Sequence, residues 1–449
     1  MIERIALGMK NKYDYVVIGS GPGGGTIAME LANEDSTCLI LEYGPRLKKT
    51  GFLNVAPKAF LDKTKRTLRS DGNIWFGRSR VLGGGSYVAQ GNAATPPQKI
   101  LDEWKIDLAE ELRWAKRMLR VIPMPEKYMG KATKRINQAA AHLGWEMKST
   151  PKCVDFSKCI QCSLCMFGCP TGAKWTSIEF VDKAVAKGAD LLLETEVTRI
   201  LHKHGKVTGV LAVHKGKEIM IRADNVILAA GALSTPVILQ NSGIPAGQGL
   251  AGDIFQTTYG YHPEIGMKGE IILGTYLESA ITERELFPAP YMYIPFFVQR
   301  DIDGGMPEKM GKVQQAKMIL KSKKVDISHL IGMMTKIRDE RSGKVEKDGT
   351  IHKYLTERDK NKLKEAHEIN KEILIATGVK PDSIFTGVYE SGHPCCTAAI
   401  GEVVGNNQET EIKGLFVSDA SMFPSPLGMP TILTIVAMAR RLAKILLAR

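Results

Sequence analysis

Near the N-terminus, short apolar runs alternate with glycine-rich and polar segments. Residues 15–18 read Tyr-Val-Val-Ile, and residues 38–41 read Cys-Leu-Ile-Leu. An unbroken apolar run of this length is typical of a strand that is buried on both faces of a parallel sheet. Residues 26–33, between the two runs, have helical character. The pattern therefore predicts a strand–helix–strand unit with a glycine-rich turn at residues 19–25.

Further along the chain the pattern changes several times. We predict helices over residues 101–119 and 131–143, a β-meander over 191–213 with a turn at Gly205, and a buried strand over 225–230. Residues 430–449 are apolar but interrupted by basic residues, so they predict an amphipathic helix rather than a membrane span. Residues 255 to about 375 carry no cofactor motif and predict a second domain. The fold class that follows is α/β.

The turn at residues 19–24 reads Gly-Ser-Gly-Pro-Gly-Gly, which is the pattern G-x-G-x-x-G. In a dinucleotide site, Gly19 makes the tight turn, Gly21 lets the backbone approach a pyrophosphate, and Gly24 lets helix and strand pack closely. The helix N-terminus then presents free N–H groups to the phosphates. Glu42, 18 residues beyond Gly24, is placed to accept from a ribose hydroxyl. The motif predicts a dinucleotide site, with a packing turn as the alternative, and does not distinguish NAD from FAD.

Three later segments give the chain a resemblance to the glucose–methanol–choline (GMC) oxidoreductase family. They are residues 80–86 (Arg-Val-Leu-Gly-Gly-Gly-Ser), residues 231–244, and residues 414–421 with 430–435. The resemblance implies FAD as the cofactor. It places cofactor contacts at Gly83, Gly84, Gly85 and Ser86 in the first signature, at Gly231 in the second, at Val197 for the adenine, at Asp419 for the ribityl chain, and at the backbone of Met429, Pro430 and Thr431 for the pyrimidine ring. Pro430 would stand in the first turn of the last helix, where its missing N–H is no loss.

The resemblance also indicates a catalytic base at His393, because the family places a His before a Pro on a loop that faces the flavin. An imidazole suits proton removal because its pKa lies near neutrality. A loop histidine without chemistry is the alternative. The family's second catalytic residue is His or Asn, but here Met429 stands there, and a thioether neither donates a strong hydrogen bond nor takes a proton. Ala89 also replaces an Asn of the first signature, so a mechanism with a single base stays open.

Five of the eight cysteines fall between residues 153 and 169. Four of them have the C-x2-C-x2-C-x3-C-P spacing of bacterial ferredoxins, at Cys159, Cys162, Cys165 and Cys169. We expect a 4Fe–4S cluster that has the first three as ligands. The fourth ligand is Cys169 or Cys153, with Cys169 preferred. Zinc held by four thiolates is the second interpretation, and disulfides or free thiols are the third.

The flavin segments are distributed along the chain, so we expect a Rossmann-like FAD-binding domain with a parallel sheet and a β-meander. An α+β substrate domain resting on an antiparallel sheet would be inserted into it. The expected boundaries are 10–100, 179–254 and 386–449 for the three parts of the FAD-binding domain, the last with the catalytic loop; 101–150 for a helical connection or cap; 151–178 for the cysteine insert; and 255–385 for the substrate domain.

Our main functional hypothesis is a dehydrogenase that oxidises a C–OH group of a small molecule and passes electrons singly through the cluster to an external carrier. Reduced clusters are oxygen-sensitive, which suits an anaerobe. The second hypothesis, motivated by Met429, is a cluster-fed reductase of a C=C, C=O or disulfide bond. The third is an electron-transfer subunit of a larger complex. Cys395 and Cys396 would suit disulfide chemistry beside a flavin, although adjacent small residues more often only pack.

The 449-residue chain is 44% apolar and 24% charged, as expected of a globular protein. Its net charge of +13 is spread along the chain, so we interpret it as solvated surface and expect no nucleic-acid partner. A ferredoxin-like carrier or a partner subunit would suit this charge, whereas peripheral membrane contact is not indicated. Residues 1–13 lack the apolar core of a secretion signal, so we expect a cytoplasmic location.

Overall fold

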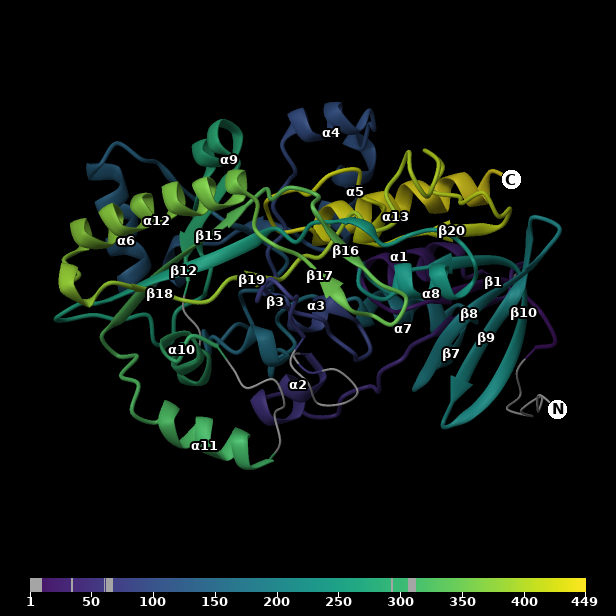
Figure 1. Cartoon of the computed structure of the whole chain (residues 1–449), viewed down its shortest axis with the longest axis horizontal. Coiled ribbons are helices and arrows are strands. Elements are labelled where there is room, and N and C mark those ends of the chain that lie inside the picture. Colours follow the sequence, from purple (N-terminus) through teal and green to yellow (C-terminus); the bar gives the residue numbers. More distant parts are fainter. Residues whose placement is uncertain (1–9, 34, 60, 62–67, 292–293, 306–311) are drawn as a thin grey trace.

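Two β-sheets organise the chain, and helices cover their outer faces (Figure 1). The computed structural model describes residues 10–33, 35–59, 61, 68–291, 294–305 and 312–449. Residues 1–9, on which the expectation about a secretion signal largely depends, lie outside this range. The architecture confirms the predicted α/β class, a Rossmann-like sheet accompanied by a second, mixed sheet.

The first sheet has seven strands in the order β7-β2-β1-β10-β9-β8, with β20 paired to β10. The strands are β1 (Tyr13–Ile18), β2 (Cys38–Leu41), β7 (Asp190–Leu192), β8 (Thr195–Lys203), β9 (Lys206–His214), β10 (Lys217–Leu228) and β20 (Leu415–Val417). β1 runs parallel to both β2 and β10; of the predicted run at residues 15–18, Val16, Val17 and Ile18 are buried and Tyr15 is half-buried. The predicted meander is present but extends into β10, whose first half pairs with β9 and whose second half pairs with β1.

Helices α1 (Pro22–Leu31), α7 (Ile178–Ala186) and α13 (Ile432–Leu447) pack together on one face of this sheet. The predicted helix over residues 101–119 is wrong in one respect, because the structure has two helices, α4 (Gln98–Trp104) and α5 (Ala109–Met118). Lys105 ends α4 in the left-handed conformation, and the Asp107 carboxylate accepts from Ala109 N at 2.9 Å, which starts α5 anew. A local cap therefore overrides the helical pattern.

The second sheet has the order β14-β15-β12-β19-β3, with β18 paired to β12. Its strands are β14 (Leu286–Pro290), β15 (Leu330–Ile337), β12 (Ile254–Tyr261), β19 (Glu390–Ser391), β3 (Trp75–Phe76) and β18 (Phe385–Thr386). All pairings are antiparallel except the parallel pair of β19 and β3. Helix α12 (Glu357–Thr377) covers one face, beginning at a capping box of Thr356 and Asp359 and ending at Gly378. The other face, with Lys336 and Met334, is directed to the central cavity.

The remaining elements are short and join these sheets. They are α2 (Phe52–Ala59), α3 (Gly85–Val88), β4 (Ile122–Pro123), η1 (Glu126–Tyr128), α6 (Lys131–His142), β5 (Met147–Ser149), β6 (Pro151–Lys152), η2 (Cys165–Phe167), α8 (Thr235–Asn241), β11 (Gln248–Leu250), β13 (Thr275–Leu277), α9 (Glu278–Arg284), α10 (Pro295–Ile302), α11 (Lys312–Ser322), β16 (Gly343–Val345), β17 (Ile351–His352), η3 (Pro381–Ser383) and η4 (Ala420–Met422). The cysteine loop, around η2, packs against α2 and α3. The expected domain boundaries stay a prediction.

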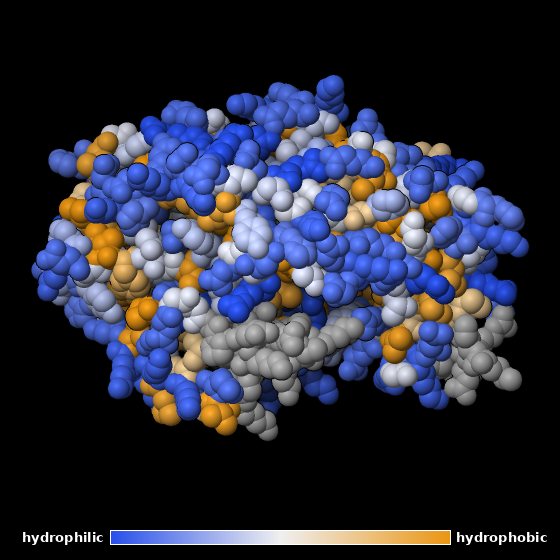
Figure 2. Space-filling view, in the orientation of Figure 1, coloured by the Kyte–Doolittle hydropathy of each residue, from blue (hydrophilic) through white to orange (hydrophobic). Residues whose placement is uncertain are grey.

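The surface seen in Figure 2 is mostly hydrophilic, with smaller apolar areas between. Among the exposed apolar side chains, Val313 and Leu320 lie on α11. Within the part of the chain that the structure describes, no helix is long and apolar enough to cross a membrane.

Candidate active site

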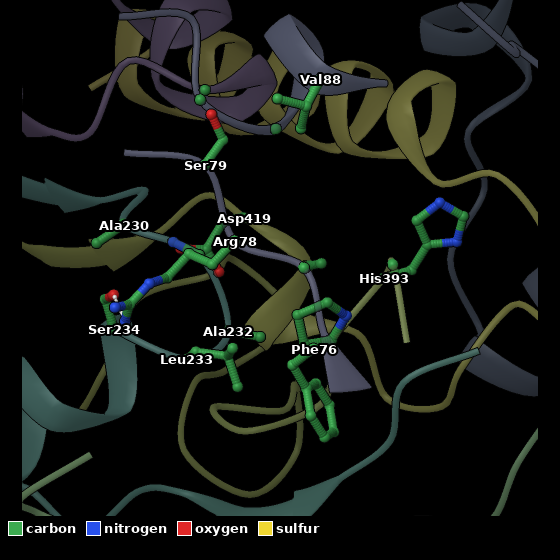
Figure 3. A pocket seen from close by; sticks show the side chains of 18 of the residues that line it. Phe76, Arg78, Ser79, Val88, Ala230, Ala232, Leu233, Ser234, His393 and Asp419 are labelled. Carbon is green, nitrogen blue, oxygen red and sulfur yellow. Dashed lines mark hydrogen bonds between the residues drawn. The ribbon is translucent and has the colours of Figure 1, made fainter. Parts of the chain in front are cut away.

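A cavity of about 720 Å³ lies where the two sheets face each other. Many of the residues that the sequence indicates for the cofactor line it: Gly19, Gly21, Glu42, Gly84, Gly85, Val197, Gly231, Asp419, Pro430 and Thr431. His393 lines it as well. In Figure 3, Arg78 and Ser234 lie on one side, joined by a 3.4 Å hydrogen bond, and His393 lies on the other. The fold therefore brings segments from across the whole chain to one space.

The glycine turn forms one corner of this cavity. Gly19 has φ +100°, and a Cβ there would stand 2.3 Å from the Ala229 carbonyl oxygen. A Cβ on Gly24 would stand 1.9 Å from the Gly19 carbonyl oxygen, so this glycine is required for close packing. Gly21, in contrast, faces open space and has only the Gly84 Cα nearby, at 4.0 Å. Helix α1 starts here with Gly21 as N-cap and no side-chain cap, so its first N–H groups are left for a ligand.

Glu42 occupies the end of β2, as the sequence predicts, and is almost completely buried. Its Oε2 accepts from Ser20 N at 3.0 Å and from Ser20 Oγ at 2.5 Å, while Oε1 accepts from Gly44 N at 2.7 Å. Burial raises the pKa of this carboxyl group, and the hydrogen bonds oppose the rise. The same carboxylate therefore braces the glycine turn and lines the cavity.

Asp419, which is expected at the ribityl chain, also lines the cavity. Its Oδ2 accepts from Gly231 N at 2.8 Å and Thr235 Oγ1 at 2.6 Å, and its Oδ1 accepts from Ser421 N at 2.8 Å. Burial raises the pKa of Asp419, against the effect of these donors. Two of the predicted signatures thus meet at this carboxylate.

Four of the indicated cofactor residues do not line the cavity. Gly24 packs under Gly19, and Gly83 N donates to Ser20 Oγ at 2.9 Å. Ser86 Oγ donates to the Gly83 carbonyl at 2.5 Å and accepts from Ser177 N at 2.8 Å. Met429 is buried behind the lining. The expectation that Pro430 stands in the first turn of the last helix is wrong, because Thr431 is the N-cap of α13 and Pro430 precedes it. Thr431 O accepts the first helical bond, from Ile435 N.

His393 is held by a residue that carries no motif. Its Nδ1 lies 3.3 Å from Asp253 Oδ2, and Asp253 Oδ1 accepts from Gly428 N at 2.6 Å. The Met429 backbone also hydrogen-bonds both side chains, which lowers the pKa of Asp253 and raises the pKa of His393. Asp253 is fully buried and is followed directly by β12, so the carboxylate has a fixed position. Asp253 and His393 thereby form a pair in which the carboxylate orients the ring.

A second residue without a motif is Lys336, on β15. Its Nζ lies 4.0 Å from the centre of the Phe255 ring, which is directly opposite on β12, and 3.9 Å from where a Cβ of Gly392 would stand. Burial lowers the pKa of Lys336 to about 8. Burial likewise raises the pKa of Asp253 to about 7 and lowers the pKa of His393 well below its usual range, with Lys336 acting in the same direction on His393. The one available signal was a single lysine within the apolar run at residues 330–337.

Comparison with known proteins identifies this arrangement. The chain matches the GMC oxidoreductase family over residues 13–267 and again over residues 317–439. It belongs to the GMC oxidoreductase family. The expected resemblance is thereby confirmed.

Relatives of this GMC oxidoreductase include proteins of different lengths. An uncharacterized GMC-type oxidoreductase of Mycobacterium tuberculosis is 32% identical over 251 residues, which are 51% of this chain and 39% of the relative. A long-chain-alcohol oxidase of Arabidopsis thaliana is 26% identical over 513 aligned positions, 95% of this chain and 67% of that protein. An uncharacterized protein of Methanocaldococcus jannaschii is 24% identical over 434 aligned positions, which are 96% of this chain and 99% of that protein. The match thus spans about two fifths of the length of the Mycobacterium tuberculosis relative and nearly all of the Methanocaldococcus jannaschii relative.

Solved structures share the fold of this GMC oxidoreductase. The pyridoxine 4-oxidase from Mesorbium loti has a TM-score of 0.71 at 15% identity, with 97% of this chain and 99% of that chain covered. A formate oxidase has a TM-score of 0.69 at 15% identity and covers 98% of each chain. At this level of identity the likeness concerns the fold, with its FAD-binding Rossmann-like domain.

The cavity fits the FAD that the family implies. The space at Gly21 is open to a pyrophosphate, and the carboxylate of Glu42 lies beside it. Ser79 also lines the cavity, and its buried hydroxyl has no hydrogen-bond partner among the described residues (Figure 3). A buried polar group without a partner is costly, so a ligand that supplies one fits there.

The cysteine loop of this GMC oxidoreductase encloses a second cavity, of about 30 Å³. The four cysteines with ferredoxin spacing, Cys159, Cys162, Cys165 and Cys169, all line it, together with Lys174. Cys153 does not; its buried Sγ donates to the Gly91 carbonyl at 3.3 Å, and burial raises its pKa to about 11. Within the described ranges, no three His, Cys, Asp or Glu side chains converge enough to hold a metal ion. The expected metal site, whether iron–sulfur or zinc, therefore has no formed ligand set here.

The adjacent pair Cys395 and Cys396 is buried away from the central cavity. Both thiols are free, with 3.5 Å between the two Sγ atoms. Burial raises the pKa of Cys395 well above its usual range, which disfavours the thiolate. These contacts agree with the packing interpretation.

Proposed function

We propose that this chain is an FAD-dependent dehydrogenase of apolar alcohols, with His393 as the base. When bound, FAD supplies the acceptor for a hydride from the carbinol carbon. His393 would take the hydroxyl proton at Nε2, since Asp253 occupies Nδ1 and holds the ring in place. The lowered pKa of His393 keeps the imidazole neutral, and so able to accept a proton, at neutral pH.

The substrate class is suggested by the side of the cavity opposite the glycine turn. Apolar side chains from segments far apart in the chain line it: Leu68, Met166, Phe255, Leu273, Phe297 and Met334. A pocket of this kind excludes water and binds a hydrocarbon tail by burial of apolar surface. That a relative is named a long-chain-alcohol oxidase supports the same class.

We also propose that the cysteine loop holds a 4Fe–4S cluster with Cys159, Cys162, Cys165 and Cys169 as ligands. The four thiols line one cavity, while Cys153 is turned to a backbone carbonyl, which supports Cys169 as the fourth ligand. Unlike a zinc ion, a cubane is large, so its four thiolates are spread around it rather than gathered at one point. A cluster would transfer electrons one at a time to an external carrier, and this carrier, not oxygen, would be the electron acceptor.

The observation that carries the electron relay is the position of Gln90. This residue lines both the central cavity and the cysteine cavity, so the two cavities share part of their lining. Lys174 ties the two regions together, because its Nζ donates to the carbonyls of Tyr87, Ala89 and Cys165 at 2.6 to 2.9 Å. The loop along the predicted flavin site is thus fixed to the cysteine loop.

The test is cofactor analysis of protein purified without oxygen. We expect FAD, iron and acid-labile sulfide, with flavin absorbance bleached by 1-octanol and reoxidised faster by ferricenium than by air. Cys162→Ser and Cys169→Ser should lose iron and keep FAD, whereas the matched variant Cys153→Ser should keep both. Protein with FAD but without iron would refute the relay, and iron loss in Cys153→Ser alone would refute the ligand set.

A further inference from the structure

Four lysines are buried in the described part of the chain, and they differ in their partners. Lys152 Nζ donates to Asn92 Oδ1 and the Ile272 carbonyl, and Lys174 Nζ donates to three carbonyls. Lys353 Nζ is paired with Asp339 at 2.8 Å and donates to Ser342 Oγ. The Nζ of Lys336, a residue only 4% exposed, has no hydrogen bond or ion pair within the described ranges, and the Lys336 backbone pairs with Phe255 on β12 and Phe287 on β14. Its Nζ lies over the face of Phe255, 4.0 Å from the ring centre.

A ring face does not satisfy an ammonium group. Lys336 has three N–H donors, and the Phe255 ring interacts with the charge without accepting three hydrogen bonds. The charges of Asp253 and Glu390 favour the ammonium form, but burial of N–H donors that have no acceptor still costs free energy. Because Lys336 lines the central cavity, its donors are available to a molecule that enters.

The surroundings locate where Lys336 acts. The charged or titratable groups that face it are Asp253, His393 and Glu390, and Glu390 is already held by Arg300 through two 2.8 Å bonds. Nζ lies 3.9 Å from the Cβ position of Gly392, the residue before His393. The ammonium is therefore beside the catalytic loop rather than at the far end of the substrate pocket. The family position that would supply a second polar group holds the thioether of Met429, which is buried outside the lining.

We propose that Lys336 is a catalytic residue that donates a hydrogen bond from Nζ to the substrate oxygen whose proton His393 removes. This inference rests on the proposed alcohol chemistry. In that reaction the O–H proton goes to His393, the C–H hydride goes to FAD, and the C–O bond becomes C=O. Lys336 keeps its proton throughout and stabilises the negative charge that develops on the oxygen. Run backwards, the same donor polarises a carbonyl, so the role is independent of direction.

The test compares Lys336→Met, which removes the donor at similar length, with Lys336→Arg, which retains a permanent cation. We expect anaerobic flavin bleaching by 1-octanol to slow by about 10²- to 10³-fold in Lys336→Met, as for other lost donors to a developing oxyanion, and to be partly restored in Lys336→Arg. The wild-type rate should fall above about pH 8, where Lys336 loses its charge, and this limb should vanish in Lys336→Arg. Lys344→Met, the same change at an exposed position, is the control.

A second readout does not depend on turnover. Benzoate titrated into the FAD-loaded protein should perturb the flavin spectrum, and its Kd should rise at least about tenfold in Lys336→Met. An unchanged bleaching rate and pH profile in Lys336→Met would overturn the proposal. Loss of benzoate binding with an unchanged bleaching rate would also overturn it, because Lys336 would then only bind carboxylates. Equal loss of bound FAD in both variants would indicate a structural role. If 1-octanol and other alcohols fail to bleach the wild type, the proposed function itself falls.

Discussion

The central cavity has two walls that are built in different ways. The wall from the first sheet is built around glycine backbone at Gly19, Gly21, the start of α1 and the loop at Gly84, with side chains such as Glu42 and Val197 beside it. The wall from the second sheet consists of side chains that project from strands, such as Lys336, Met334 and Phe255. A backbone wall tolerates few residue types, because a Cβ would collide with the protein at Gly19 and would occupy the space open to a cofactor at Gly21, whereas a side-chain wall accepts any residue that fits the pleat.

This difference separates binding from selectivity. The backbone wall can serve a cofactor common to a whole family, since N–H groups and open glycine positions recognise a pyrophosphate whatever the substrate is. The side-chain wall can change one residue at a time while the sheet keeps its register. We therefore expect substitutions in the first wall to affect folding or FAD, and substitutions in the second to affect the reaction.

The largest effect is expected from Gly24→Ala. The new Cβ would lie 1.9 Å from the Gly19 carbonyl oxygen, so α1 and β1 must separate, at a cost of about 3 kcal/mol or more. The matched variant Gly21→Ala meets no protein atom closer than 4.0 Å and should leave the apoprotein intact while weakening FAD binding roughly 100-fold, about 2.8 kcal/mol.

Thermal unfolding of the apoproteins and fluorescence titration with FAD distinguish the two effects. A lowered Tm for Gly24→Ala with an unchanged Tm for Gly21→Ala is the expected result. Equal destabilisation of both apoproteins would contradict the division of roles within the glycine turn.

The next effect concerns the loop at the junction of the two walls. His393→Gln keeps a polar side chain but removes the base, so flavin bleaching by 1-octanol should slow by about 10²- to 10⁴-fold. Bound FAD should stay at the wild-type level, because the predicted cofactor contacts lie on the other wall. The control is His142→Gln at the exposed end of α6. A bleaching rate of His393→Gln within a factor of about two of the wild-type rate would show that His393 is not the base.

The two walls also explain what the sequence could predict. The βαβ unit, Glu42 and the signature loops were found because backbone contacts restrict the residues at fixed spacings. Asp253 and Lys336 carry no such restriction; each reaches the site through the pairing of β12 with β15, a contact between residues about 80 positions apart in the chain. The break between α4 and α5 was missed for a different reason, because local features decide it: the left-handed Lys105 ends α4, and the Asp107 carboxylate accepts from Ala109 N at the start of α5. Long-range sheet register and local capping are the two kinds of information that the hydrophobic pattern leaves out.

The smallest expected effect is on the pH dependence of flavin bleaching, which distinguishes titration of Asp253 from titration of His393. Asp253 is charged only above its raised pKa of about 7, and only the carboxylate accepts from Nδ1 and leaves Nε2 free to take a proton. The wild-type bleaching rate should therefore fall as the pH drops through about 7, although the lowered pKa of His393 would by itself keep the base active at lower pH. Asp253→Asn cannot titrate, so this acid limb should disappear.

The rate of Asp253→Asn at its optimum should be about 10- to 100-fold below wild type, as for other groups that orient a functional histidine. Asp182→Asn, at a surface pair with Arg46, provides the matched control for the substitution. Bleaching rates measured from about pH 5 to about pH 9 decide the assignment. An acid limb that remains near pH 7 in Asp253→Asn would assign that limb to another group, and Lys336 would then be the one charged residue of the side-chain wall with a proposed role in the reaction.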